Sequence, residues 1–401
     1  MIYACRWLLP IDGPPIERGW IEIDNGRIRG LGRGVPPARA HDLGDVALLP
    51  GLVNAHTHLE LSWMAGLVPP AESMDAWIRA LLKLRRAGPP GGQEQVLRAA
   101  REAAAAMAKA GTVLVGDITN SLVSPRVLAD AGIGGVVFHE LLGFDAAEPA
   151  QMVKRAAAQA ESEAEAVAHA HVPIHVTVVA HAPYSVSPAL FREIASRASA
   201  VPLAVHLGES AEEMELLRTG RGPIRDLLET LGVWTDLWPV PSCDPVEYMH
   251  RLGYLRPGLL AVHAVHLTDE ALATLAESEA VVVTCPRSNL WVGAGMPRVA
   301  HFYAAGLPVA IGTDSLASVD TLNLFDELAE LRRVAPDVTA ASLLDSATRV
   351  GAVALGFGSS FGTLSPGKRA ALVAVDVPAD VTDVEEYLVS GVPASAVRRM
   401  S

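Results

Sequence analysis

The sequence predicts an α/β protein with a (β/α)8 barrel at its centre and a small β-sheet domain built from both chain ends. Eight short apolar runs alternate with segments of helical period, which is the pattern of buried parallel strands joined by helices. A chain of 401 residues is long enough for such a barrel and a small companion domain. An open, doubly wound sheet is the alternative that the same alternation permits.

The first 47 residues predict short strands separated by turns. Residues 1–9 and the run ERGWIEID are strand-like, and Asn25-Gly26 is a typical hairpin turn before RIRGLG. A similar strand is predicted at 367–377, beyond a long helical stretch. We therefore assign residues 1–47 and 349–401 to one small sheet domain, as its N-terminal and C-terminal segments, and residues 48–348 to the barrel.

The predicted barrel strands are VALLPGLVN, GTVLVGDIT, GGVVFHE, IHVTVVAH, VPLAVH, LLAVH, AVVVTC and PVAIGTD. Segments 94–110 and 150–169 have helical period, and a helix at 74–86 is expected to form a wall of the pocket. Residues 218–257 are rich in proline and tryptophan and too long for a simple loop. They predict an insertion over one face of the barrel, acting either as a substrate cover or as a hydrophobic plug.

Composition excludes several classes of protein. Half of the residues are hydrophobic and only 19% are charged, which argues against a disordered chain. A net charge of −13 argues against nucleic acid or an acidic membrane as the partner. Three widely spaced cysteines form neither a disulfide framework nor a CxxC metal motif, and we see no membrane span or signal peptide. We expect a cytoplasmic enzyme with a small-molecule substrate, and a homo-oligomer stays open.

Metal-capable side chains end several of the predicted strands. They are His56, His58, His206, His263 and Asp314. A lone histidine is more often an ordinary loop or core residue, but strand ends of a barrel converge on one mouth. Imidazole and carboxylate ligands suit Zn²⁺, with Fe²⁺ or Mn²⁺ also compatible. The ordered set therefore predicts one metal ion per chain.

Glu209 follows His206 by three residues, in the run HLGES. A carboxylate so placed can reach a metal-activated water without binding the ion, which is what a general acid/base requires. The simpler interpretation is that Glu209 opens the following helix, where acidic residues are favoured. Glu212 and Glu213 fit that simpler role better.

These motifs resemble the amidohydrolase superfamily over nearly the whole chain. PGLVNAHTH, HLGES, HAVHL and GTDS are similar to its first-, fifth-, sixth- and eighth-strand motifs. The bridging lysine of binuclear members is missing, because the fourth predicted strand ends in His181 and carries no lysine. The mononuclear deaminase and chlorohydrolase branch is the better match, and HAPYSVS and CPRSN resemble its segments. The run PGKRAALVAV departs from the family pattern by lacking an acidic residue.

The resemblance implies that the sheet domain of residues 1–47 and 349–401 is a β-sandwich that flanks the barrel. It also implies a zinc-dependent aminohydrolase that releases ammonia. His56, His58, His206 and Asp314 would bind the metal, Glu209 would transfer protons, and His263 would orient the attacking water, so that Glu209, His263 and Asp314 are the catalytic residues. The substrate-binding residues expected within the motifs are Glu60, His181, Arg287, Asn289 and Ser315.

The run HLGESAEEMELLRTG and the insertion are most similar to aminodeoxyfutalosine deaminases, which serve menaquinone biosynthesis. Their substrate, 6-amino-6-deoxyfutalosine, is an adenine nucleoside extended by a benzoate. A guanidinium such as Arg287 can hold a carboxylate through two hydrogen bonds, unless it pairs with a neighbouring acid instead. An adenosine or S-adenosylhomocysteine deaminase, a chlorohydrolase with the same site, and a silent metal-binding scaffold are the alternatives. Cys285 is assigned no chemistry.

Overall fold

Two four-stranded parallel sheets form the centre of the computed structural model, which describes residues 1–197 and 201–400. The first contains β6 (Leu52–Thr57), β7 (Thr112–Thr119), β8 (Gly134–Leu141) and β9 (Ile174–Ala180), paired in that order. The second contains β10 (Ala204–Leu207), β11 (Leu260–His263), β12 (Val281–Thr284) and β13 (Val309–Ile311). Every predicted apolar run thus contains one parallel strand.

The two parallel sheets adjoin at both edges. The backbone N–H of His206 donates to the carbonyl of His181, which joins the ends of β9 and β10. Thr57 forms a parallel bridge with Asp314, which joins β6 to the segment after β13. The prediction of eight parallel strands is confirmed, and their closure into a continuous barrel stays a prediction.

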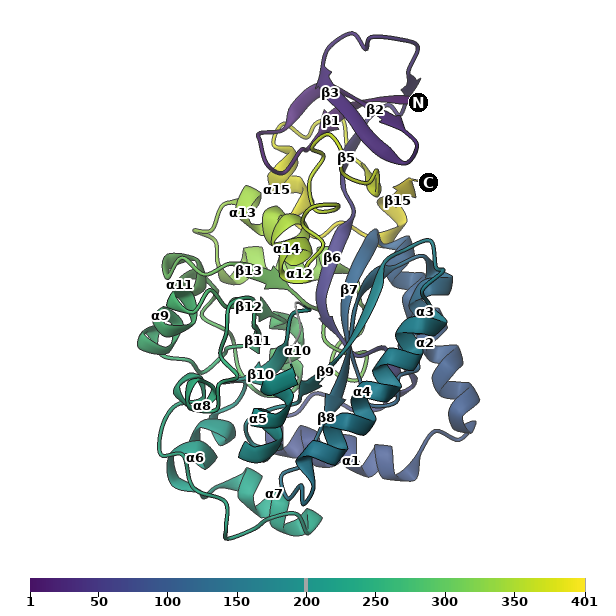
Figure 1. Ribbon diagram of the computed structural model, residues 1–401. Coiled ribbons are helices and arrows are strands. Elements are labelled where there is room, and N and C mark those ends of the chain that lie inside the picture. The colour runs from purple at the N-terminus through teal and green to yellow at the C-terminus, as the bar shows by residue number, and fades with distance from the viewer. Residues whose placement is uncertain (198–200, 401) are drawn as a thin grey trace.

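Helices cover the outer faces of these sheets (Figure 1). The larger ones are α1 (Met74–Ala87), α2 (Gly92–Lys109), α3 (Ser124–Ala131), α4 (Pro149–Ala166), α5 (Pro188–Arg197), α9 (Asp269–Glu277) and α12 (Leu324–Val334). Shorter ones are α6 (Ala211–Thr219), α7 (Pro223–Leu231), α8 (Pro245–Arg251), α10 (Pro286–Trp291), α11 (Val299–Ala304), α13 (Ala340–Asp345), α14 (Gly351–Ala354) and α15 (Val384–Leu388). The 3₁₀-helices η1 (Leu59–Met64) and η3 (Ala394–Ala396) and the π-helix η2 (Ser346–Val350) complete the helical elements.

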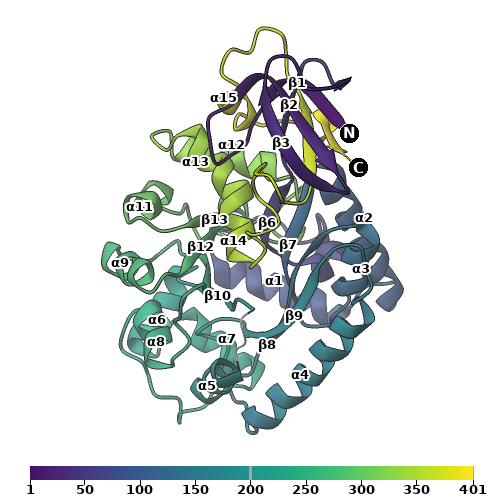
Figure 2. The ribbon, with the colours of Figure 1, turned by 45° about the horizontal axis from the view of Figure 1, so that its top comes forward.

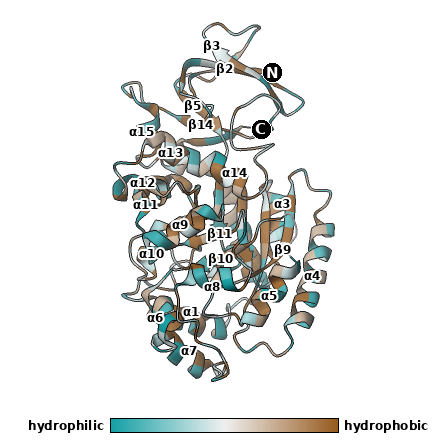
Figure 3. Ribbon diagram, turned by 60° about the vertical axis from the view of Figure 1, so that its left-hand side comes forward, coloured by the Kyte–Doolittle hydropathy of each residue, from teal (hydrophilic) through white to brown (hydrophobic). Residues whose placement is uncertain are grey.

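Hydrophobic periodicity explains why these segments are helical. In α2, the buried residues Ala100, Ala103, Ala104 and Met107 recur at helical spacing and form one face toward the sheet. β7 and β8 are buried along their whole length, as expected for parallel strands covered on both faces. Figure 3 shows the same contrast, with brown hydrophobic residues on β9 and mixed colours along α4.

A separate seven-stranded sheet lies at the end of the molecule that carries both termini (Figures 1 and 2). Its strands are β1 (Ile2–Leu8), β2 (Ile16–Asp24), β3 (Arg27–Arg33), β4 (His41–Asp42), β5 (Val46–Pro50), β14 (Leu372–Asp376) and β15 (Val397–Met400). β5 pairs with β14, so both chain ends share this sheet. Hydrogen bonding joins all seven strands into one sheet, and the second layer of a sandwich stays a prediction.

One local detail agrees with the sequence prediction, and another differs from the expected domain boundary at residue 348. The predicted hairpin turn is present, since Asn25 and Gly26 have φ values of 51° and 70° between β2 and β3. The helical residues 349–354 pack against β6 and β13 rather than on the seven-stranded sheet. The parallel sheets therefore keep a helical cover slightly beyond residue 348, because the π-helix η2 continues directly into α14. No helix within residues 1–197 and 201–400 is long and apolar enough to cross a membrane.

Candidate metal centre

Four imidazoles and one carboxylate converge where the parallel strands end. His56 lies on β6 with His58 just beyond it, His206 is on β10, His263 ends β11, and Asp314 follows β13. The Nε2 atoms of His56 and His58 are 3.2 Å apart, and Asp314 Oδ1 is 3.8 Å and 3.5 Å from them. Candidate ligand atoms of His56, His206 and His263 also lie within 4.8 Å of one another. The structure thus brings together all five residues that the sequence singled out.

The spacing of these atoms fits a divalent ion. A tetrahedral zinc site with Zn–N bonds of about 2.0–2.1 Å places neighbouring ligand atoms about 3.3 Å apart. The separations among His56, His58 and Asp314 are close to that value. Burial, together with neighbouring imidazoles, lowers the pKa of His56 and His206 well below the usual range, so both rings are neutral and able to bind a metal. These residues therefore fit the predicted ion.

Close packing of the backbone brings β6 together with the segment that follows β13. The carbonyl of His56 accepts hydrogen bonds from the N–H groups of Thr313 and Asp314. Gly312 makes this approach feasible, because a Cβ there would lie 2.7 Å from the Cβ of His56 and 2.8 Å from the Sγ of Cys285. Asp314 and His263 have φ values of 60° and 76°. Such left-handed backbone is costly for non-glycine residues and is concentrated at functional sites.

Three serines orient the carboxylate of Asp314. The hydroxyls of Ser288 and Ser318 donate to Oδ2 of Asp314, which leaves Oδ1 facing His56 and His58. Ser315, predicted to bind substrate, is buried and bonds the Ser318 hydroxyl. Its observed contacts therefore belong to the support of Asp314, while a direct contact with substrate stays a prediction.

Glu209 precedes the helix and faces His263. Helix α6 begins at Ala211 after Ser210, whose hydroxyl caps the N–H of Glu213. The Glu213 carboxylate reaches back and accepts hydrogen bonds from the N–H groups of Gly208 and Glu209, at 3.1 Å and 2.9 Å. This local arrangement turns the Glu209 side chain into the site, with Oε1 3.4 Å from Nε2 of His263. The helix-start role belongs to Glu212 and Glu213.

The electrostatic environment of Glu209 favours its protonated form. Burial first, and the charge of Asp314 second, raise the pKa of Glu209 well above its usual range. A divalent cation bound beside it would oppose this rise. A buried carboxyl that can both lose and regain a proton is the type of group that transfers protons in hydrolytic sites.

Asn289 contacts His263 instead of facing open space. Its Oδ1 lies 2.8 Å from Nδ1 of His263, so Nδ1 carries the proton and Nε2 is left facing Glu209. Asn289 Nδ2 is buried without a partner among the described residues. The predicted role of Asn289 in substrate binding remains a prediction, and its observed contact is with a catalytic candidate.

His181 and Glu60, which are also predicted to bind substrate, have different surroundings. The His181 ring is 4.8 Å from that of His206, and its Nδ1 is 2.6 Å from the Ser185 hydroxyl. Burial lowers the pKa of His181 to about 4. The Oε2 atom of Glu60 accepts four hydrogen bonds from Thr119 and from residues 120–121, and these bonds hold the pKa of Glu60 below its usual value despite burial.

Arg287 lies in a cluster of acidic side chains. Its guanidinium hydrogen-bonds Asp320 and lies 3.4 Å from Oε1 of the buried Glu327. It also donates to the carbonyl of Thr321. These contacts favour the alternative weighed from the sequence, in which Arg287 pairs with neighbouring acids, and the binding of a substrate carboxylate by Arg287 stays a prediction.

Sequence reasoning missed a polar group beside the centre. Glu140, on β8, places Oε1 3.7 Å from Nδ1 of His206 and is 5% exposed. Asn120 donates to its Oε2, and Arg85 donates to the Asn120 side-chain oxygen. The pattern that identified the metal candidates also applies to Glu140, because this polar residue lies near the end of a buried apolar run, GGVVFHE.

The predicted insertion packs against the loop that follows β8. Phe144 in that loop stacks on Trp234 and lies against Trp238, with ring centroids 5.5 Å and 5.3 Å apart. Trp238 is buried in the main hydrophobic core. The tryptophans thus anchor the insertion, as expected of a plug, and α7 also contacts α1. A role as substrate cover stays a prediction.

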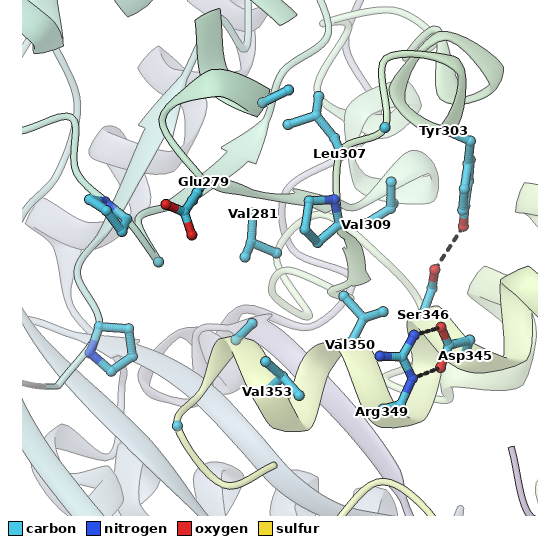
Figure 4. Close-up of a pocket in the computed structure, with 18 of the residues that line it drawn as sticks. Glu279, Val281, Tyr303, Leu307, Val309, Asp345, Ser346, Arg349, Val350 and Val353 are labelled. Atoms are coloured by element: carbon cyan, nitrogen blue, oxygen red, sulfur yellow. Dashed lines mark hydrogen bonds and ion pairs between the residues drawn. The ribbon is translucent and has the colours of Figure 1, made fainter. Parts of the chain in front are cut away.

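A second cavity lies at the opposite ends of the strands. It has a volume of about 1010 Å³ and is lined by Val281, Val309, Tyr303 and Val350, among others (Figure 4). Val281 and Val309 are the first residues of β12 and β13, whereas the metal candidates follow strand C-termini. Arg349 in this cavity pairs with Asp345 and is not aimed at the metal centre. The cavity is therefore separate from the site.

Known proteins resemble this chain over most of its length. Residues 47–397 match the amidohydrolase family. A 5-methylthioadenosine/S-adenosylhomocysteine deaminase of Moorella thermoacetica is 30% identical over 391 residues, covering 92% of this chain and 84% of that protein. An aminodeoxyfutalosine deaminase of Deinococcus radiodurans is 30% identical over 324 residues, 79% of this chain and 75% of that protein. The solved structure of an adenosine deaminase from Xanthomonas campestris with bound zinc superposes with a TM-score of 0.82 at 26% identity, covering 99% and 90% of the two chains.

Proposed function

The chain belongs to the amidohydrolase family, and from this premise we propose that it is a metal-dependent hydrolytic deaminase of an aminopurine nucleoside. One observation carries the proposal. The Glu209 carboxyl lies 3.4 Å from His263 and beside a buried set of imidazoles and one carboxylate that can hold an ion. The Moorella relative is named a 5-methylthioadenosine/S-adenosylhomocysteine deaminase and the Deinococcus relative an aminodeoxyfutalosine deaminase.

The overall reaction exchanges the exocyclic amino group for oxygen. Water adds to the ring carbon that bears the amino group, the carbon–nitrogen bond breaks, and ammonia leaves. A bound divalent ion would supply Lewis-acid chemistry that makes the attacking water more acidic. The residues that would hold it are His56, His58, His206 and Asp314.

The chain's own groups move the protons. Glu209 accepts a proton from the attacking water and delivers a proton to the adjacent ring nitrogen, and it later assists the departing ammonia. His263, fixed by Asn289 through Nδ1, orients the attacking water with Nε2 and stabilises charge on the adduct. The serines behind Asp314 keep its free oxygen turned toward the imidazoles.

We further propose zinc as the native ion, at one per chain, and 6-amino-6-deoxyfutalosine as the substrate. The Deinococcus relative supports this substrate, and through it a role in menaquinone biosynthesis. The Moorella relative supports 5-methylthioadenosine or S-adenosylhomocysteine with equal identity. Because the Arg287 guanidinium already pairs with Asp320 and Glu327, it gives no support to a benzoate-bearing substrate.

Ammonia release from a panel of substrates tests the proposal. The zinc-loaded protein is assayed with aminodeoxyfutalosine, S-adenosylhomocysteine, methylthioadenosine, adenosine, guanine and cytosine, and with a chlorotriazine followed by chloride release. Ammonia from one or more adenine nucleosides, with the highest kcat/KM for aminodeoxyfutalosine, is expected. Turnover of the chlorotriazine alone would overturn the deaminase proposal, and a higher kcat/KM for another nucleoside would overturn only the substrate.

A further inference from the structure

Glu140 is a buried carboxylate at the edge of the metal centre, and one of its oxygens has no hydrogen-bond partner among the described residues. We propose that Glu140 is a substrate-binding residue that accepts hydrogen bonds from the sugar hydroxyls of the nucleoside. The inference rests on the proposed function, because it assigns the part of the substrate that this wall of the site recognises. It makes the enzyme selective for nucleosides with an intact ribose diol.

The position of Glu140 suits a group that contacts substrate rather than the ion. The Nδ1 atom of His206 lies 3.1 Å from the carbonyl of His181 and 3.7 Å from Oε1 of Glu140. The opposite nitrogen of the ring is therefore the one left for the metal. Glu140 therefore lies outside the set of atoms that face the ion, and it lines a cavity of about 560 Å³ together with Arg85, Asn120 and Met152, which offers space for the rest of a ligand.

The two oxygens of Glu140 differ in their surroundings. Oε2 accepts a hydrogen bond of 3.0 Å from Nδ2 of Asn120, which fixes the side chain. Oε1 is buried and has no hydrogen-bond partner in the described portion of the chain. A buried carboxylate oxygen without a donor is costly, so the ligand that enters the site is the expected source of one.

Glu60, the neighbouring carboxylate, provides the contrast. Its Oε2 already accepts four hydrogen bonds from Thr119 and residues 120–121, and its Oε1 lies 3.8 Å from Arg85. Its acceptor capacity is used by the protein itself. Glu140 is the nearby carboxylate whose free oxygen faces the rings of His206 and His181.

The chemistry of the free oxygen defines the partner. A carboxylate oxygen without a donor accepts hydrogen bonds, so the expected partner is a group that donates them. Burial raises the pKa of Glu140 to about 7, and hydroxyl donors supplied by a ligand would lower it again. Vicinal hydroxyls supply two donors at a spacing that one carboxylate can receive. A second cation between Glu140, His181 and His206 is the competing occupant. It would have to displace the contacts of His206 Nδ1 with the His181 carbonyl and of His181 Nδ1 with Ser185.

The test compares Glu140→Gln with wild-type zinc enzyme on adenosine and 2′,3′-dideoxyadenosine. Glutamine keeps the shape and the contact with Asn120 but removes the charge. We expect kcat/KM for adenosine to fall roughly 10- to 100-fold, the loss of a charge-assisted hydrogen bond, mainly through KM. Dideoxyadenosine should change less than about threefold, and zinc content should stay at the wild-type value. Glu148→Gln, an exposed acid in the segment between β8 and α4, is the matched control.

Binding measurements keep the two proposals separable. Calorimetry with coformycin and 2′-deoxycoformycin should show that wild type prefers coformycin and that Glu140→Gln loses this preference. Equal losses on adenosine and dideoxyadenosine, or loss of a second metal equivalent, would overturn the inference while the deaminase function stands. A wild-type protein that binds both coformycins equally would overturn it without any variant. Absence of ammonia release from every nucleoside would overturn the proposed function, and the coformycin pair would still decide the role of Glu140.

Discussion

Replacing Glu209 with glutamine removes the proton-transfer group and little else. The amide has the size of the carboxylate and can keep a contact with His263, 3.4 Å away. The loop around it is held by Glu213 through the backbone N–H groups of Gly208 and Glu209, which the substitution leaves intact. We therefore expect Glu209→Gln to fold and to bind zinc as the wild type does.

The size of the effect follows from the burial of the site. A positioned general acid/base contributes about 10²–10⁴-fold in rate, which is about 2.7–5.5 kcal/mol of barrier at 1.36 kcal/mol per tenfold change. Glu209 is only 4% exposed, so bulk water has little access to replace it. Glu213, the nearest acid in sequence that is also buried, is engaged with the backbone. We expect kcat to fall by about 10³-fold, the middle of that range.

The assay is single-turnover ammonia release with adenosine or the best substrate of the panel, with metal content measured on the same samples. Glu212→Gln is the matched control, because it removes the same charge from the first turn of α6 without touching the centre. Its activity should stay within about twofold of wild type, because the half-buried Glu212 acts on Glu209 only as a charge, and less than burial and Asp314 do. A Glu209→Gln enzyme with near-normal kcat would refute the assignment, and parallel losses in Glu209→Gln and Glu212→Gln would refute the geometric argument.

Four further expectations concern the ion, its supporting residues and Arg287. Removal of the ion with a chelator should abolish ammonia release, and one equivalent of zinc per chain should restore it; a requirement for two equivalents would contradict the single site. Ser288→Ala removes a hydrogen bond to Asp314 and should weaken zinc binding by about 10- to 100-fold, as measured by competition with a chromophoric chelator. Gly312→Ala would place a Cβ 2.7 Å from that of His56, so zinc content and activity should fall together, whereas Gly13→Ala, where a Cβ meets nothing within 4 Å, should retain both. Arg287→Ala removes the guanidinium from the buried Glu327, which keeps only the backbone N–H of residue 287, and should cost about 1–3 kcal/mol of unfolding free energy, with equal effects on all substrates; a loss confined to aminodeoxyfutalosine would instead support carboxylate binding by Arg287.

Local sequence patterns were sufficient for the strands, the turns and the metal candidates. Apolar runs of the length of a buried strand end in His56, His206 and His263, and parallel strands must deliver their ends to one side of the sheets. The Asn25-Gly26 turn was predictable because few residue pairs tolerate two positive φ angles. These features depend on neighbours within a few residues, which is the range over which sequence patterns carry information.

Contacts between distant segments were decided only by the tertiary structure. Arg287 and Glu327 are 40 residues apart, so the sequence could not show which acid engages the guanidinium. The same holds for Asn289, which contacts His263 from helix α10, and for Glu140, whose unpartnered oxygen could be placed beside His206 only by the tertiary structure. Strand-end patterns determine which side chains reach the centre, because backbone direction is local. The partner of each side chain depends on how separate βα units pack together, and that packing is set by the sum of many weak contacts across the whole fold.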